Sequence, residues 1–115
     1  MTTENRRLDE MHHVAVAVND IGKAVEWYTD TFACSVLYQD ATWAYLEFSN
    51  MKLALVLPSQ HPCHIAFEGP EPSRFGEVKT HRDGVRYVYL TDPFGNTVEV
   101  VGTTSSAARG PVARE

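Results

Sequence analysis

This sequence is poor in cysteine, in basic residues and in long apolar runs. Its 115 residues include two cysteines, Cys34 and Cys63, whose spacing does not indicate a redox pair, so we expect both to be small buried hydrophobes. Its 10 lysines and arginines against 15 acidic residues give a formal net charge of -5, which leaves no positive field to attract phosphates. Nucleic acid and an anionic membrane surface are therefore not expected partners.

No apolar run is long enough to cross a bilayer, and no charged segment followed by an apolar one opens the chain, so we expect a cytoplasmic protein. The hydrophobic share of 43% and the aromatic share of 10% suffice for the core of one globular domain. Residues 1–10 and 103–115 are polar or rich in small residues and show no period. They are predicted to be flexible tails around a domain of residues 11–102.

Hydrophobic alternation predicts eight strands and a single helix. The strand-like segments are residues 11–18, 34–39, 43–49, 51–58, 63–69, 77–84, 85–93 and 96–102. The helix follows the first strand: Asn19 or Asp20 can cap it, and an apolar stripe at helical spacing continues to about residue 33. Residues 70–76, at the corresponding place in the second half, contain two prolines and no apolar period, so no second helix is expected.

Three titratable residues stand on strands that are otherwise largely apolar. Alternation in the first strand places His13 on one face and His12 on the other, where we expect a surface position. His64 lies at the start of the strand at 63–69, and Glu99 lies between valines in the last strand. Each has a plain structural interpretation when taken alone. A carboxylate on the inner face of a strand, however, is costly unless it is paired, hydrogen-bonded or bound to a metal.

The segments "HHVAVAVNDIGKAVEWY" and "DPFGNTVEVV", in the order strand, helix and three strands, resemble the vicinal oxygen chelate superfamily. Its members include glyoxalases, extradiol dioxygenases, fosfomycin-resistance proteins and bleomycin-binding proteins. The resemblance covers residues 11–102. It implies an α+β fold whose paired βαβββ modules form a curved sheet around a cup, with the second module lacking its helix. It also implies that His13, His64 and Glu99 are ligands of a divalent metal.

Two neutral imidazoles and one carboxylate can occupy one face of an octahedron and leave the other positions to water and substrate. Fe²⁺, Mn²⁺, Ni²⁺, Co²⁺ and Zn²⁺ are all compatible with these ligands. The resemblance therefore implies a metal-dependent enzyme of dioxygenase or lyase type, whose substrate chelates the metal through adjacent oxygens. Tyr89, or alternatively Tyr87, would act as the catalytic tyrosine that donates a hydrogen bond or a proton to a bound oxygen.

The sequence departs from several members of the superfamily. Glyoxalase-type and epimerase-type members have a fourth ligand where this chain has Ala54 or, with a slip of one residue, Leu55, which argues against a glyoxalase I mechanism. Extradiol dioxygenases have a further acid-base histidine, for which His81 is the remaining candidate. Lys79 and Arg82 lie near the phosphonate-binding cations of the fosfomycin group, although both have a plain interpretation as solvated side chains. That group's hydroxyl residue is replaced here by an alanine, two positions after the first histidine.

The main alternative is a metal-free binding protein of the bleomycin-resistance type. In it Trp43, Tyr45 and Trp27 would hold an aromatic or cationic ligand, which the negative net charge favours. A regulatory binding role is a third hypothesis.

The missing second helix also has a consequence for assembly. It should leave one sheet face of the second half uncovered, and exposed apolar sheet is an association surface. We therefore predict a homodimer in which Val78, Val88 and Leu90 are buried against a second subunit.

Overall fold

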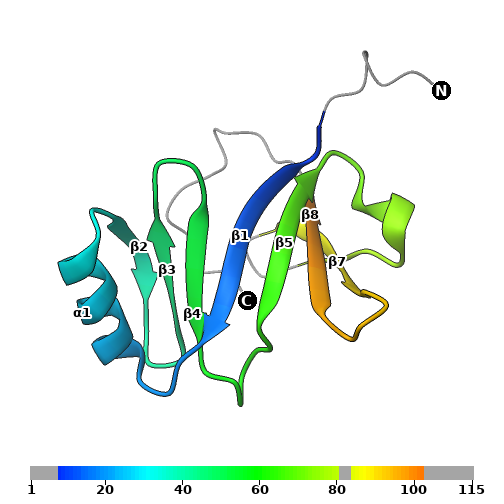
Figure 1. The fold of residues 1–115 in the computed structure, drawn as a ribbon. Coiled ribbons are helices and arrows are strands. Elements are labelled where there is room, and N and C mark those ends of the chain that lie inside the picture. Colours follow the sequence, from blue (N-terminus) through cyan, green and yellow to red (C-terminus); the bar gives the residue numbers. More distant parts are fainter. Residues whose placement is uncertain (1–7, 81–83, 103–115) are drawn as a thin grey trace.

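The structure is a computed structural model that describes residues 8–80 and 84–102. The described residues form one eight-stranded sheet and a single α-helix. Figure 1 shows that the sheet is curved. The strands are β1 (Glu10–Ala17), β2 (Ser35–Gln39), β3 (Trp43–Glu47), β4 (Lys52–Val56), β5 (His64–Gly69), β6 (Lys79–Thr80), β7 (Arg86–Thr91) and β8 (Thr97–Gly102). The helix α1 spans Ile21–Thr31, and one turn of 3-10 helix, η1, spans Pro72–Phe75. The predicted order of elements is confirmed. The predicted tails lie largely outside the described residues, as do His81 and Arg82.

The sheet consists of two modules with the same connectivity. The strand order is β2-β3-β4-β1-β5-β8-β7-β6. The first module is β1, α1, β2, β3 and β4, and the second is β5, η1, β6, β7 and β8. Within each module the first strand pairs parallel with the last, and the modules join through an antiparallel pairing of β1 with β5. The predicted fold of paired modules in a curved sheet is therefore confirmed.

Helix α1 covers one face of the first module. Asp20 caps it, since its side chain accepts a hydrogen bond from the Lys23 backbone N–H at 3.0 Å. The apolar stripe of the helix is buried against the sheet in a cluster that contains Ile21, Val25, Ala44, Leu46 and Leu55. This packing defines the helix face of the sheet.

A second buried cluster lies on the opposite face and contains Ala15, Trp43, Tyr45, Ala54 and Val56. We call this the cup face, since His13 shares it with Ala15 by strand alternation. Trp27 lies on α1, and therefore on the other side of the sheet, with 56% of its surface exposed. Within one subunit, Trp27 therefore cannot share a ligand in the cup with Trp43 and Tyr45.

The second module has no α-helix among its described residues, as predicted, and η1 takes its place. Gly76, which follows η1, has a φ of 153°, and a Cβ there would lie 3.3 Å from a methyl carbon of Val88. Val88 is only 3% exposed because its own chain covers it, so the expectation that a second subunit buries it is wrong. Ile65, on the helix face of β5, remains 39% exposed.

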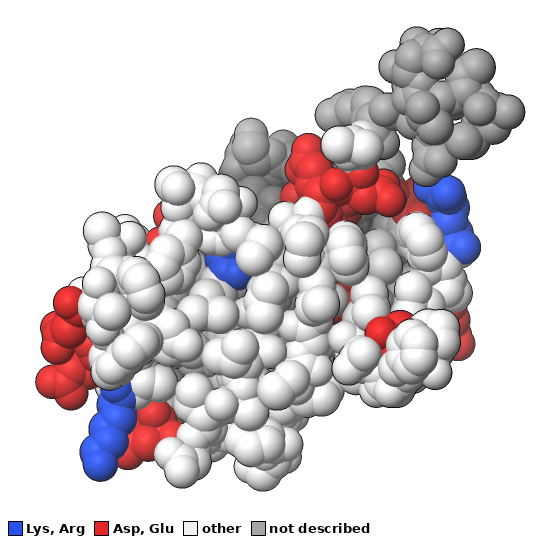
Figure 2. Space-filling model, in the orientation of Figure 1, with Lys and Arg blue, Asp and Glu red and all other residues white. Residues whose placement is uncertain are grey.

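The surface agrees with the acidic composition. Among the described residues on the face shown in Figure 2, lysine and arginine are few and scattered, and uncharged residues predominate. No helix within residues 8–80 and 84–102 has the length and apolar character needed to span a membrane. Both thiols are free: Cys34 is half-buried, whereas Cys63 is exposed, so the prediction of a buried thiol is wrong for Cys63.

Candidate metal centre

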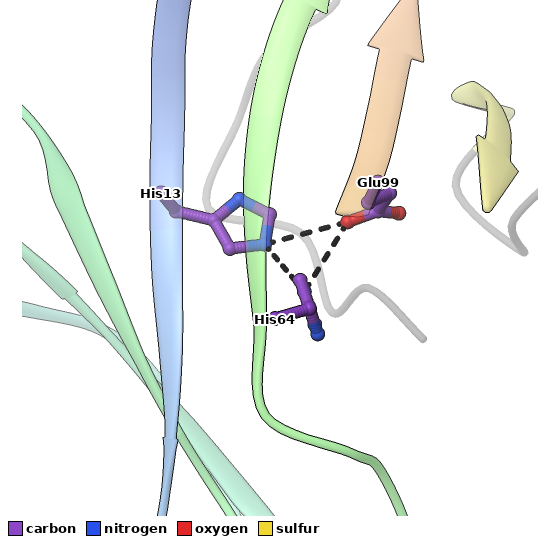
Figure 3. A group of neighbouring side chains, drawn as sticks. All are labelled: His13, His64 and Glu99. Atoms are coloured by element: carbon purple, nitrogen blue, oxygen red, sulfur yellow. Dashed lines mark hydrogen bonds and ion pairs between the residues drawn. The ribbon is translucent and has the colours of Figure 1, made fainter. Parts of the chain in front are cut away.

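The three predicted metal ligands converge on the cup face (Figure 3). His13 Nε2 lies 3.1 Å from His64 Nε2 and 3.5 Å from a carboxylate oxygen of Glu99. The same oxygen lies 3.4 Å from His64 Nε2. All three side chains are no more than 7% exposed. Groups far apart along the chain thus form one small triangle of ligand atoms.

Strand register brings these residues together. On β1 and β5, His13 lies opposite Ala66 and Ala15 lies opposite His64. Ala66 in turn lies opposite Glu99 on β8. Because alternate residues of a strand point to one face, the three functional side chains project from three adjacent strands toward the same side. The alanines between them leave room for the larger groups to converge.

The hydrogen bond made by His64 Nδ1 shows which nitrogen of the ring carries the hydrogen. His64 Nδ1 lies 3.1 Å from the carbonyl oxygen of Pro62. A carbonyl can only accept a hydrogen bond, so Nδ1 carries the hydrogen, and Nε2 of the neutral ring keeps its lone pair. That lone pair is directed at the ligand triangle, which is the arrangement that a metal-binding imidazole requires.

The donor atoms fit a divalent cation. Bond lengths of about 2.1 Å separate ligand atoms by about 3.0 Å at octahedral angles and about 3.4 Å at tetrahedral angles, close to the three separations here. Glu99 is 2% exposed, and a buried carboxylate is costly unless its charge is balanced. Lone pairs from two imidazoles and a carboxylate would repel one another without a cation or a proton between them. Both the size and the chemistry of the group therefore suit a metal.

His12 lies where sequence alternation did not place it. The β1–β5 register shifts between Met11 and His13, so that His12 is the extra residue of a β-bulge. Its side chain is turned toward that of His13, and their Nδ1 atoms lie 2.8 Å apart. His12 is 6% exposed. The expectation of a surface His12 facing away from His13 is therefore wrong.

Tyr45 is a second residue whose proximity to the centre sequence reasoning missed. Its hydroxyl lies 3.3 Å from His12 Nδ1 and 3.4 Å from His13 Nδ1. Tyr45 stands on β3 opposite Ala54 of β4, and β4 separates β3 from β1. The ring can reach His13 because the alanine between them is small. The sequence indicates Tyr45 only as an aromatic residue that would hold the ligand of a metal-free binding protein.

Tyr89 lies beside the ligand triangle. It stands on β7 directly opposite Glu99, and its ring centroid lies 6.0 Å from that of His64. Tyr89 is 41% exposed. Tyr87 pairs with Val101, one step further along the sheet, and its ring centroid is 5.3 Å from that of Tyr89. Of the two tyrosines proposed from the sequence, Tyr89 is thus placed nearer the ligands.

The register also identifies the position of a fourth ligand in the first module. Ala54 lies opposite Ala15 on the cup face, as Glu99 lies opposite Ala66 in the second module. Leu55 belongs to the cluster on the helix face, which excludes the alternative of a one-residue slip. Since alanine has no donor atom, this position cannot supply a fourth protein ligand.

Other features lie outside the centre. Lys79 is exposed at the start of the short strand β6, in keeping with a solvated side chain. An open hollow of about 530 Å³ is lined by Ala33, Cys34, Ser35, Glu47, Phe48 and Ser49. None of these residues belongs to the ligand triangle, so the hollow is not the metal centre.

No profile of a known protein family matches this sequence, and no curated protein resembles it in sequence. Solved structures do resemble its fold. A hypothetical protein of Bacillus halodurans C-125 matches with a TM-score of 0.70 at 15% identity, covering 87% of this chain and 98% of that one. A Streptomyces coelicolor methylmalonyl-CoA epimerase variant, in complex with 2-nitronate-propionyl-CoA, matches with a TM-score of 0.66 at 18% identity, covering 86% and 100%.

Homoprotocatechuate 2,3-dioxygenase from Brevibacterium fuscum matches with a TM-score of 0.62 at 21% identity, covering 84% of this chain and 33% of the larger enzyme. The epimerase and the dioxygenase are both members of the vicinal oxygen chelate superfamily. At such identities the likeness concerns the fold. Together with the paired modules and their strand order, it shows that this chain has the vicinal oxygen chelate fold.

Proposed function

We propose that this protein is a divalent-metal-dependent enzyme, of dioxygenase or lyase type, that acts on a small substrate with adjacent oxygens. His13, His64 and Glu99 would hold the metal. The observation that carries the proposal is the convergence of their ligand atoms at separations of 3.1 to 3.5 Å, from three different strands. The fold it shares with an epimerase and a dioxygenase supports the proposal.

The small number of protein ligands favours a catalytic role. A structural metal usually has a full protein ligand set, whereas a catalytic one keeps positions open for water or substrate. Here the fourth position of the first module is Ala54, which contributes no donor atom. A substrate with two neighbouring oxygens could therefore bind beside the three protein ligands.

The chain's own residues would divide the chemistry as follows. A bound divalent cation supplies Lewis acidity, which stabilises negative charge on a substrate oxygen. The two imidazoles and the carboxylate would hold the cation. The hydrogen bond from His64 Nδ1 to the Pro62 carbonyl fixes the orientation of the His64 ring. Tyr89, opposite Glu99 and partly exposed, would donate a hydrogen bond or a proton to the substrate oxygen.

Elemental analysis tests the metal centre directly. The protein is purified without added metal or chelator, and the measurement is repeated on His64→Ala and on His61→Ala as a control histidine outside the ligand triangle. One equivalent of metal that is lost only in His64→Ala supports the proposal. Absence of metal under every loading condition contradicts it and favours the metal-free binding protein, with Trp43 and Tyr45 on its cup face.

The reaction type needs a separate test. Protein loaded with Fe²⁺ under anaerobic conditions is mixed with catechols, and oxygen uptake is recorded on admission of air. Uptake that depends on Glu99 supports a dioxygenase. If a broad panel gives no uptake while the metal stays bound, lyase, isomerase or transferase chemistry is favoured.

We also propose that the protein is a homodimer, and a cytoplasmic location stays a prediction. Ile65 and Phe75 in the second module are 39% and 43% exposed, which leaves apolar surface for a second copy. Sedimentation equilibrium of the wild type and of Ile65→Lys tests this. A wild-type dimer that becomes a monomer in the variant supports the proposal, and a wild-type monomer at all concentrations contradicts it.

A further inference from the structure

We propose that His12, together with Tyr45, is a positioning residue of the metal centre. His12 Nδ1 would accept the hydrogen of His13 Nδ1 and so fix the ring orientation and the tautomer in which His13 Nε2 can bind a metal. The inference rests on the proposed function, but part of it can be tested without any metal.

The contact is built into the fold. The β-bulge at His12 breaks the alternation of β1 and turns two consecutive side chains toward each other, with an Nδ1–Nδ1 distance of 2.8 Å. Tyr45, from β3, closes the group with its hydroxyl 3.3 and 3.4 Å from these atoms. All three residues are 6% exposed. Buried polar groups of this kind need hydrogen-bond partners within the protein.

The chemistry of imidazole then assigns the roles. A neutral ring carries its hydrogen on one nitrogen and a lone pair on the other. If His13 Nε2 is to present its lone pair toward His64 and Glu99, its Nδ1 must carry the hydrogen. His12 Nδ1, 2.8 Å away, must then be the acceptor, with its own hydrogen on Nε2. The Tyr45 hydroxyl oxygen, 3.4 Å from His13 Nδ1, can accept a share of the same hydrogen and so favours this tautomer.

The two histidine ligands are therefore held by different means. His64 Nδ1 donates to a backbone carbonyl, that of Pro62, at 3.1 Å. His13 Nδ1 instead has a side chain as its acceptor, and a side chain can be replaced without changing the backbone. Partners that orient a metal-binding histidine typically contribute about 10-fold to 100-fold in metal affinity.

The first test measures Co²⁺ affinity and the Co²⁺ absorption spectrum in a matched pair of variants. Asn keeps an acceptor near the position of His12 Nδ1, whereas Leu has none. We expect His12→Leu to weaken Co²⁺ binding about 10-fold to 100-fold and to alter the spectrum, and His12→Asn to stay within about threefold of wild type. Tyr45→Phe should have a smaller effect, and His61→Leu none. Equal losses in His12→Leu and His12→Asn, or wild-type affinity in both, would overturn the proposal.

The second test needs no metal. In chelator-treated, ¹⁵N-labelled protein, at a pH where the rings are neutral, NMR shifts report which nitrogen of each histidine carries hydrogen. We expect His13 to be protonated on Nδ1 in the wild type and in His12→Asn, and to lose this single tautomer in His12→Leu. A His13 protonated on Nε2 in the wild type overturns the inference even if the metal centre is real.

The two tests also separate the inference from the proposed function. A wild-type protein that binds no metal but shows the expected tautomer contradicts only the function. A second equivalent of Co²⁺ that is lost in both His12→Leu and Tyr45→Phe would mean that these groups bind a metal themselves, and it would overturn the positioning role.

Discussion

In the first module Ala15 of β1 lies opposite Ala54 of β4, and in the second module Ala66 of β5 lies opposite Glu99 of β8. The two modules thus place an alanine and a glutamate at equivalent positions of the same strand pairing. Each module contains one histidine of the candidate ligand triangle, but only the second contains its carboxylate. Modules with the same strand order can therefore differ in their capacity to bind a metal, because a single side chain decides whether a position offers a donor atom.

The modules also differ in how their helix faces are covered. In the first, α1 buries a cluster that includes Leu46 and Leu55, both fully buried. In the second, the chain at Gly76, just after η1, lies against Val88, whereas Ile65 stays partly exposed. Hydrophobic stabilisation grows with the apolar area removed from water, so it is concentrated in the first module.

The largest effect is expected from substitutions at the two equivalent positions, Glu99 and Ala54. Glu99→Ala should weaken metal binding by more than about 100-fold, because it removes a ligand rather than a residue that orients one. Ala54→Ser, at the matching place in the first module, should leave one equivalent bound. Elemental analysis and chelator competition measure both. Metal retained in Glu99→Ala would show that the carboxylate is not a ligand.

The next largest effect concerns the covered and uncovered helix faces. Leu55→Ala should lower the free energy of unfolding by about 2 to 5 kcal/mol, because it creates a cavity beneath α1. At protein concentrations low enough to keep the chain monomeric, Ile65→Ala should cost less than about 1 kcal/mol, because the side chain is partly exposed within one subunit. Urea unfolding followed by circular dichroism measures both. A cost at Ile65 that grows with protein concentration would indicate that a second copy covers this face.

A smaller effect on stability is expected from substitutions at the N-terminal ends of α1 and η1. Asp20→Ala should destabilise the protein by about 1 kcal/mol, since the side chain caps α1 through the Lys23 N–H. Glu71, at the start of η1, accepts a hydrogen bond from the Ser73 hydroxyl and pairs with Arg86, but its side chain is 48% exposed. Exposed pairs contribute little, so Glu71→Ala should change the unfolding midpoint less. Thermal unfolding of both variants is the measurement. If Glu71→Ala proved the more damaging, η1 would contribute more to stability than its length suggests.

The smallest effect is a pH dependence at two turns. Burial by itself would raise the pKa of Asp40, but hydrogen bonds from Tyr38, Thr42 and Trp43 outweigh it and lower the pKa from 3.8 to about 2. A carboxylate with a lowered pKa stabilises the fold above its ordinary pKa, and this contribution is lost as the pH falls toward the folded value. The stability advantage of the wild type over Asp40→Asn should therefore shrink between about pH 4 and pH 2.

Asp92 offers a comparison in the second module. Hydrogen bonds from the side chain and backbone of Asn96 and from the Phe94 N–H lower the pKa of Asp92, so the sign is the same. Urea midpoints across this pH range, for Asp40→Asn and Asp92→Asn, measure both effects. An advantage that grows on acidification would contradict the assigned hydrogen bonds.

Much of this architecture could be predicted from local patterns. Alternation located the strands, and the helical stripe after Asp20 located α1, because both signals depend on neighbouring residues. The two prolines in residues 70–76 correctly excluded a second helix. The missing second helix led to the prediction that Val88 lies at a subunit interface. That prediction is wrong because the chain at Gly76 folds back over Val88, which no local pattern indicates.

The candidate centre was predictable only in part. His13, His64 and Glu99 were found because alternation and the resemblance agreed on them. His12 was missed because a bulge shifts the pattern by one residue and has no marker in the local sequence. The reach of Tyr45 toward His13 depends on the small residue of the strand between them, a contact that no spacing along the chain reveals.

The sequence by itself determined the order of the elements and the position of the helix, which follow from the side-chain periodicity that strand and helix geometry impose locally. It indicated His13, His64 and Glu99 as candidate ligands only through the resemblance to the vicinal oxygen chelate superfamily. Only the tertiary structure decided that the ligand atoms lie within 3.5 Å of one another and that His12 and Tyr45 join His13. The reason is that strand register and the bulge arise from pairings between segments distant in the chain, where a shift of one residue moves a side chain to the other face.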